Sequence, residues 1–189
     1  MTFIVRTATR DDLEIVVSCR IAFLGSVRGP DFRPSGGFVE RTRSFIQAEH
    51  QAGRLHTWIA EDRADIVGIV SVLLWPRPPQ PEDGRIIEAY IINLYVPPAH
   101  QRRGIGRQLL EHCLNSAEEL GIRKFLLHAT DEGRSLYDAM GFGPKPNWMD
   151  YLYHPERIQE STVRGGGLEL RSYILRSSYD DAQLPRHRP

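Results

Sequence analysis

Cysteine is scarce in this 189-residue chain, which contains only Cys19 and Cys113. Both lie in helix-like patterns, so a disulfide framework is not expected. An excess of charge is also lacking, because 24 basic residues balance 24 acidic ones, which argues against a nucleic acid or a membrane surface as partner. The longest apolar stretch, residues 66–75, is too short to cross a bilayer. Since the first residues lack a signal-peptide layout, we expect a cytoplasmic protein.

Strand and helix patterns alternate along the chain and predict an α/β protein with a central mixed β-sheet flanked by helices. Strands are expected at residues 3–7, 55–60, 66–75, 85–96 and 123–129, and helices at 9–24, 38–52, 103–120 and 131–140. The strands on either side of helix 103–120 should run parallel, because a helix connects them. Residues 25–37 are expected to form a loop, and Asp131 is expected to cap the last helix.

The length of the chain predicts one main domain, which we place at residues 1–154. Residues 155–189 are expected to form a C-terminal extension with an extra strand at 168–175 and a mobile tail. An additional edge strand could mediate contact with a second copy, so a homodimer is the hypothesis for the assembly.

The most informative segment is a basic turn with two glycines, residues 101–106, which follows an apolar strand and opens into a helix. Amide groups at a helix start have no partner inside the helix, and the helix dipole makes that end positive. Gly104 and Gly106 would let a phosphate approach this backbone closely. The segment is therefore interpreted as a pyrophosphate-binding turn.

The two glycines have other possible interpretations. The first is that both glycines serve only to reverse the chain. A dinucleotide-binding fingerprint needs a third glycine, and Leu109 stands in its place. A Walker loop needs Gly-Lys followed by Ser or Thr, which this turn lacks. Diphosphate binding and a plain structural turn are the interpretations that remain.

Two later segments accompany the turn. Gln101, Gly104 and Gly106 fit the pattern Arg/Gln-x-x-Gly-x-Gly/Ala, and residues 136–142 fit Leu-Tyr-x-x-x-Gly-Phe. Residues 128–134, between them, are similar to one form of the exit from strand five in the same family. Together the segments resemble the GNAT (GCN5-related N-acetyltransferase) superfamily. The resemblance implies the GNAT fold and transfer of an acetyl group from acetyl-CoA, a cosubstrate, to an amine, with no metal.

The resemblance also implies where acetyl-CoA binds. In the family, strands four and five splay apart, and free backbone groups of strand four hold the pantetheine arm. That role falls on the backbone of Leu94, Tyr95 and Val96. The diphosphate would lie at the basic turn and the helix start, whose residues are Gln101, Arg102, Arg103, Gly104, Ile105, Gly106, Arg107 and Gln108.

Three residues are candidates for catalysis. Tyr137 is the candidate general acid, which would protonate or hydrogen-bond the departing thiolate; the alternative is a packed aromatic ring. Glu88 is the leading candidate base, because its place on strand four is similar to that of a glutamate used by some family members. Its alternatives are binding of a cationic substrate and a solvated strand start. His128 competes as the base, since imidazole titrates near neutral pH; its alternative is a hydrogen-bonded core histidine.

Tyr90 and Asn93 lie on the same predicted strand and are candidate substrate-binding residues. A packed ring and a cross-strand hydrogen bond are their alternatives. The expected acceptor is a primary amine of a small molecule or peptide. The competing hypothesis is a catalytically inactive GNAT-like module that binds acyl-CoA or a metabolite without turnover. Tyr137 favours the enzyme, because a binding module needs the turn but not an acid.

Overall fold

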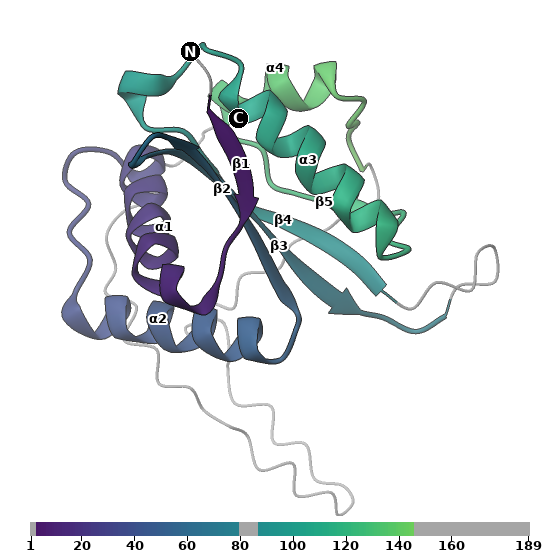
Figure 1. Cartoon of the computed structure of the whole chain (residues 1–189), viewed down its shortest axis with the longest axis horizontal. Coiled ribbons are helices and arrows are strands. Elements are labelled where there is room, and N and C mark those ends of the chain that lie inside the picture. Colours follow the sequence, from purple (N-terminus) through teal and green to yellow (C-terminus); the bar gives the residue numbers. More distant parts are fainter. Residues whose placement is uncertain (1–2, 80–86, 146–189) are drawn as a thin grey trace, which may run out of the picture. The chain divides into compact units, whose positions relative to one another are not determined.

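The computed structural model describes residues 3–79 and 87–145. All of its helices and strands lie within one compact unit, Met1–Pro144 (Figure 1). In chain order they are β1 (Ile4–Thr7), η1 (Arg10–Asp12), α1 (Leu13–Arg28), α2 (Gly36–Gln51), β2 (Leu55–Asp62), β3 (Asp65–Pro76), β4 (Ile87–Tyr95), η2 (Pro98–His100), α3 (Ile105–Glu119), β5 (Phe125–Leu126) and α4 (Asp131–Ala139). No helix in this part of the chain combines the length and apolar character that crossing a bilayer requires.

The described strands form one mixed sheet in the order β1-β2-β3-β4-β5. The first three pairings are antiparallel and β4 pairs with β5 in parallel, as expected for two strands joined by a helix. Figure 1 shows α1 and α2 on one face of the sheet and α3 and α4 on the other. The predicted α/β architecture, with a mixed sheet between helices, is confirmed.

Each face of the sheet has its own apolar core. Buried residues of α1 and α2, such as Val17 and Ile46, pack with Ile59 and Ile69 of the sheet. On the other face, residues of α3 such as Leu109 pack against other residues of β2, β3 and β4. The sheet is therefore buried on both sides, which explains why β3 reads as a nearly continuous apolar run.

Gly68 sets how closely α3 approaches β3. A Cβ atom added at Gly68 would lie 2.8 Å from Leu109 Cδ1 and 3.0 Å from Ile105 Cγ2, both on α3. Separations this short are not tolerated in a packed core. The missing side chain thus lets the first turn of α3 lie directly on the sheet.

A β-bulge interrupts β4 at Asn93. Ile92 faces Ser71 of β3 and Tyr95 faces Ile69, so Asn93 and Leu94 together oppose a single residue of β3. Asn93 has a left-handed backbone with φ of 57°, a conformation that asparagine tolerates better than most residues. Because of the extra residue, Ile92 and Tyr95 pack on the same core, although they are three positions apart.

The start of the chain is held by an arginine between two carboxylates. Arg6 of β1 donates to Asp12 at 2.7 and 2.8 Å and to Glu61 of β2 at 2.6 and 2.8 Å. Asp12 also accepts the backbone N–H of Thr9 at 2.7 Å, as in a capping box. These contacts lower the pKa of Asp12 far below its usual value, with the Arg6 hydrogen bonds as the largest cause.

Several predicted boundaries were wrong, for local reasons. α1 runs on to Arg28 and is followed by Gly29, which has φ of 91°, so residues 25–28 of the loop expected at 25–37 are helical. β5 pairs with β4 only at Phe125 and Leu126, because the two strands diverge beyond that point. The residue that caps α4 is Thr130, not Asp131: its side chain accepts the N–H of Gly133 at 3.2 Å.

The remaining predictions about domains fall on other parts of the chain. The expected strand at residues 168–175, the tail and the boundary at 154 lie outside the described residues. They stay predictions, as does the homodimer.

Candidate active site

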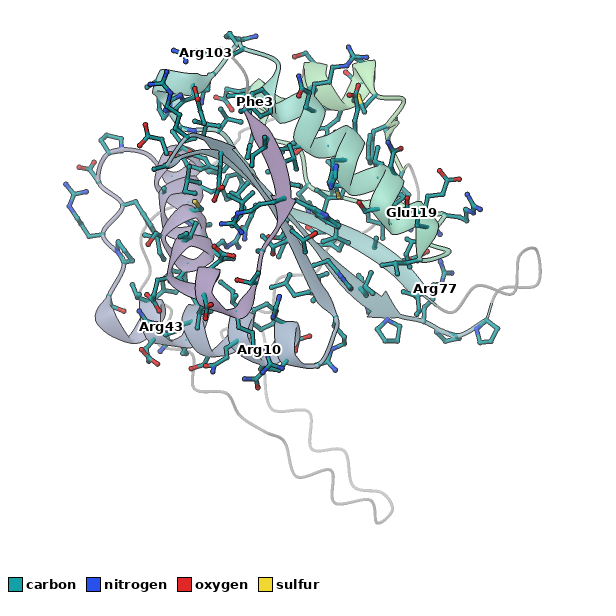
Figure 2. The ribbon with its side chains drawn as sticks, viewed as in Figure 1. Phe3, Arg10, Arg43, Arg77, Arg103 and Glu119 are labelled. Atoms are coloured by element: carbon teal, nitrogen blue, oxygen red, sulfur yellow. The ribbon has the colours of Figure 1, made fainter. Side chains whose placement is uncertain are left out.

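The start of α3 is an open cluster of amide groups. Gly104, the residue before the helix, has φ of 79°, and Arg102 has φ of 61°. The amide of Gln108 donates to Gly104 O at 3.1 Å. The amides of Ile105, Gly106 and Arg107 come before it, where a helix supplies no partner. Such a helix start attracts anions, and Arg103 projects from the adjoining loop in Figure 2.

Gly106 marks the place where α3, α4 and the end of β4 meet. A Cβ atom added there would lie 3.5 Å from Leu136 of α4 and 3.8 Å from Val96. Gln101 ties the turn to the same strand end, since its Nε2 donates to Val96 O at 3.0 Å. The predicted diphosphate-binding and pantetheine-binding residues are therefore neighbours in space.

The charged residues of the turn differ in their surroundings. Arg102 and Arg103 are exposed. Arg107 forms an ion pair with Glu111, which lies one helical turn further along α3; the Nε–Oε1 distance is 2.8 Å. Arg102 and Arg103 precede the helix start in the chain and are open to solvent, so both can contribute positive charge where an anion would bind.

β4 and β5 separate beyond their second pair. Ala89 faces Phe125 and Tyr90 faces Leu126, and no further pair forms among the described residues. The side of β4 that faces β5 is consequently without a strand partner from Ile91 to Tyr95 in this part of the chain. Open backbone groups at such a split are suited to hydrogen-bonding an extended ligand.

Four polar side chains gather beside this split from three parts of the chain. Arg20 of α1 donates from Nη1 to Asn93 Oδ1 at 2.8 Å. Arg20 also interacts electrostatically with Tyr90. The Tyr90 hydroxyl in turn hydrogen-bonds Nδ1 of His128, which follows β5. Burial raises the pKa of Tyr90, and the charge of Arg20 opposes that effect.

Tyr137 lies on α4. Its ring packs edge-on against Phe142, with 5.8 Å between ring centroids, and joins the core on the α3 face. Burial raises the pKa of Tyr137 to about 12. Leu136, the residue before it, contacts the position of Gly106, so α4 carries Tyr137 close to the start of α3.

Glu88 occupies a different environment from the other candidates. It is buried at the beginning of β4, opposite Trp75 of β3. Its Oε1 forms ion pairs with Arg77 and, at 2.5 Å, with Lys124 Nζ. Arg77 is at the far end of the strands from Arg103 in Figure 2. The carboxylate predicted as a base is therefore engaged by two cations, and the structure does not bring it together with the opening of α3.

Comparison with known proteins decides the family. The model of the acetyltransferase (GNAT) family matches residues 26–142, which is more than half of the chain. The chain belongs to the GNAT family. Among solved GNAT-type structures, a GCN5-related N-acetyltransferase from Ralstonia eutropha JMP134 is 28% identical with a TM-score of 0.71, and covers 80% of this chain and 99% of that one.

A second crystal structure supports the fold of this GNAT protein. It is a predicted acetyltransferase from Clostridium acetobutylicum, crystallised with acetyl-CoA; it is 24% identical with a TM-score of 0.74 over 80% of this chain and 96% of that one. In sequence, a ribosomal-protein-bS18-alanine N-acetyltransferase of Escherichia coli K12 is 36% identical over 58 residues, which are 29% of this chain and 39% of the relative. The chain thus matches about two fifths of the length of that relative.

Arg20, which hydrogen-bonds Asn93, was not among the candidate residues named from the sequence. The signal was present, because Arg20 falls at an inward position of the apolar helix pattern that contains Val16, Val17 and Leu24. A cation on the inward side of an amphipathic helix departs from the usual pattern. Such a departure is a reason to look for a site.

Proposed function

We propose that this protein transfers the acetyl group of acetyl-CoA to a primary amine. The observation that carries the proposal is the meeting at Gly106 of an amide-lined, positive helix start with the open end of β4 and with α4, which bears Tyr137. A diphosphate suits the helix start, and an extended arm suits the open strand backbone. The acyl group would then lie at the split, beside Tyr90 and His128.

The proposed reaction is a direct transfer. The amine nitrogen attacks the carbonyl carbon of the thioester, the C–N bond forms, and the C–S bond breaks as the thiolate leaves. The nitrogen loses one proton, for which a base is needed. Placing the two reactants in attack geometry is expected to be the largest contribution of the protein.

Tyr137 is proposed to assist the leaving thiolate. Its pKa of about 12 is well above that of a cysteine-like thiol, about 8.5, so complete proton transfer from the phenol to the thiolate is unfavourable. A hydrogen bond from the hydroxyl to the sulfur needs no such transfer. We therefore assign Tyr137 the role of hydrogen-bond donor.

His128 is proposed as the base, in preference to Glu88. His128 is exposed at the split and its Nδ1 is oriented by the Tyr90 hydroxyl. Glu88 forms ion pairs with Arg77 and Lys124, and these contacts support a structural role for it. Asn93 and Tyr90 are proposed to border the acceptor.

Two classes of acceptor deserve a direct test. The partial match to an alanine N-acetyltransferase of a ribosomal protein supports a peptide N-terminus, and a small-molecule amine is the other class. Residence in the cytoplasm remains part of the proposal.

The experiment compares acetyl-CoA with S-acetylpantetheine, which lacks the diphosphate. Calorimetry should show much tighter binding of acetyl-CoA to the protein. Replacing Arg102 and Arg103 together by Gln should weaken acetyl-CoA binding at least tenfold and leave S-acetylpantetheine binding unchanged. Arg54→Gln is the matched control, since Arg54 is exposed and pairs with Glu49 at 2.7 Å.

The same preparation separates the enzyme from the inactive module. Thiol release from acetyl-CoA with a panel of amines and short peptides is expected for the enzyme. Binding of acetyl-CoA without thiol release from any member would support the module. Equal affinity for acetyl-CoA and S-acetylpantetheine would contradict a diphosphate site at the start of α3, and with it the proposed function.

A further inference from the structure

Arg20 is a cation in an apolar setting. It is half-buried on α1, among residues that pack against the sheet, and its guanidinium carbon lies 5.6 Å from the centroid of the Phe23 ring. Burial lowers the pKa of Arg20, and the nearby charge of Arg28 acts in the same direction. Removing a cation from water is costly unless an anion compensates for it.

Six arginines of the described chain have such an anion. Carboxylates pair with Arg6, Arg43, Arg54, Arg77, Arg107 and Arg123. For Arg20, within residues 3–79 and 87–145, the hydrogen-bond partner is the neutral carboxamide of Asn93. Glu88, on the same strand as Asn93, is engaged by Arg77 and Lys124. The charge of Arg20 is thus not balanced by a carboxylate of the described chain.

We infer that the acceptor amine also bears a carboxylate, and that Arg20 binds this carboxylate during acetyl transfer. The inference rests on the proposed function. Asn93 accepts from one Nη of Arg20, and a guanidinium has further N–H donors in a planar arrangement that suits a carboxylate. Tyr90 interacts electrostatically with Arg20 and hydrogen-bonds Nδ1 of His128. Tyr90 thus links the proposed carboxylate site to the proposed base.

A purely structural role for Arg20 makes a different prediction. If Arg20 only braces the bulge at Asn93, its loss changes stability and affects every acceptor alike. If Arg20 binds the carboxylate, its loss changes KM, and only for acceptors that carry one. The two roles are separated by acceptors that differ in that one group.

The experiment measures thiol release with matched pairs of acceptors. One arm compares each amino acid or ω-amino acid with the primary amide made from its carboxylate. The second arm uses short peptides with a free N-terminus and Asp or Asn at the second position. In the arm whose acceptors react faster, wild-type kcat/KM should be at least about tenfold higher for the acceptor with the carboxylate than for its amide. The reason is that hydrogen bonds to charged groups are stronger than those to neutral groups.

Arg20→Gln should bring this ratio close to 1, through KM, with acetyl-CoA affinity unchanged. Arg20→Lys should restore part of the ratio, because it keeps the charge but loses the planar donors, and it also serves if Arg20→Gln folds poorly. Arg43→Gln is the charge control: Arg43, on α2, pairs with Glu14 at 2.7 Å and with Glu40. It should leave the ratio as in the wild type.

Three results would overturn the inference. They are equal kcat/KM for both members of every pair in the wild type, a preference for the amides, and an equal loss on both members in Arg20→Gln. In each of them acetyl transfer itself persists, so the proposed function stands. Absence of thiol release with every amine and peptide overturns the proposed function as well.

Discussion

Arg20 and Asn93, which are 73 residues apart, are joined by a hydrogen bond of 2.8 Å between Nη1 and Oδ1. The bond connects α1 to the bulge of β4. It therefore couples a helix on one face of the sheet to the position where β4 departs from regular geometry. Changing either partner tests whether the guanidinium serves the acceptor.

Asn93→Asp should give Arg20 a carboxylate of its own. We expect KM for the acceptor to rise at least about tenfold, because the new carboxylate competes with that of the acceptor. Acetyl-CoA affinity should not change. Steady-state kinetics and calorimetry measure the two effects. Asn93→Gly, which keeps the left-handed backbone, is the control for the bulge itself, and an unchanged acceptor KM in Asn93→Asp would contradict the expectation.

Tyr137→Phe should lower kcat about 10- to 100-fold, the size expected for a lost hydrogen bond to a charged sulfur. Acetyl-CoA affinity and stability should change little, since no group among the described residues hydrogen-bonds the Tyr137 hydroxyl. With a pKa of about 12, Tyr137 should not produce an ionisation in the pH–rate profile below pH 10. Turnover equal to that of the wild type would remove Tyr137 from catalysis.

His128→Gln and Glu88→Gln should have opposite signatures. His128→Gln is expected to lower kcat/KM with little change in stability, because the base is gone and His128 is exposed. Glu88→Gln should keep kcat/KM but lose about 2 kcal/mol of stability, since Arg77 and Lys124 then lack their common partner. Steady-state kinetics and urea unfolding distinguish the two variants; the reverse pattern would make Glu88 the base.

Gly68→Ala should destabilise the fold by about 1–3 kcal/mol. The added Cβ atom meets Leu109 at 2.8 Å and Ile105 at 3.0 Å, and relief requires α3 to move away from the sheet. Because Ile105 begins α3, acetyl-CoA affinity should fall as well. Gly36→Ala is the matched control, since nothing lies within 4 Å of its added Cβ. Thermal unfolding and calorimetry check both effects.

Asp12 should make stability depend on pH under acidic conditions. The pKa of Asp12 in the folded protein is depressed by Arg6, whereas in the unfolded chain an aspartate carboxyl has a pKa of about 3.9. The stabilisation is therefore complete above that value and is lost as the pH falls below it. In urea unfolding between pH 6 and pH 2, Asp12→Asn should be less stable than the wild type at pH 6 and should lose less on acidification. Parallel curves would exclude this coupling.

The parts of the fold that follow from local pattern were predictable from the sequence. The helix expected at residues 103–120 corresponds to α3, and its apolar residues Ile105, Leu109, Cys113 and Ala117 are buried. Leu120, the last residue of the expected helix, lies just after the end of α3 at Glu119 and is 58% exposed. A boundary shift of this kind depends on the chain after the helix, which a period of 3.6 residues does not describe.

The site was predictable where it is continuous in sequence, and only there. Gly104 and Gly106 are only two positions apart in the chain, so their spacing indicated the helix start. The contacts of Arg20 with Asn93, and of Tyr90 with His128, join distant segments through the tertiary fold. Arg77 and Lys124, the partners of Glu88, come just after β3 and just before β5, so the ion pairs of Glu88 could not be predicted from its own strand.

The extra residue of β4 leaves the alternation of its neighbours intact. Ile91 and Leu94 pack on one core and Ile92 and Tyr95 on the other, as they would in a strand from which position 93 had been deleted. An insertion here is therefore neutral for the packing of both layers. The side chain at position 93, which is proposed to border the acceptor, can therefore change while both cores keep their packing.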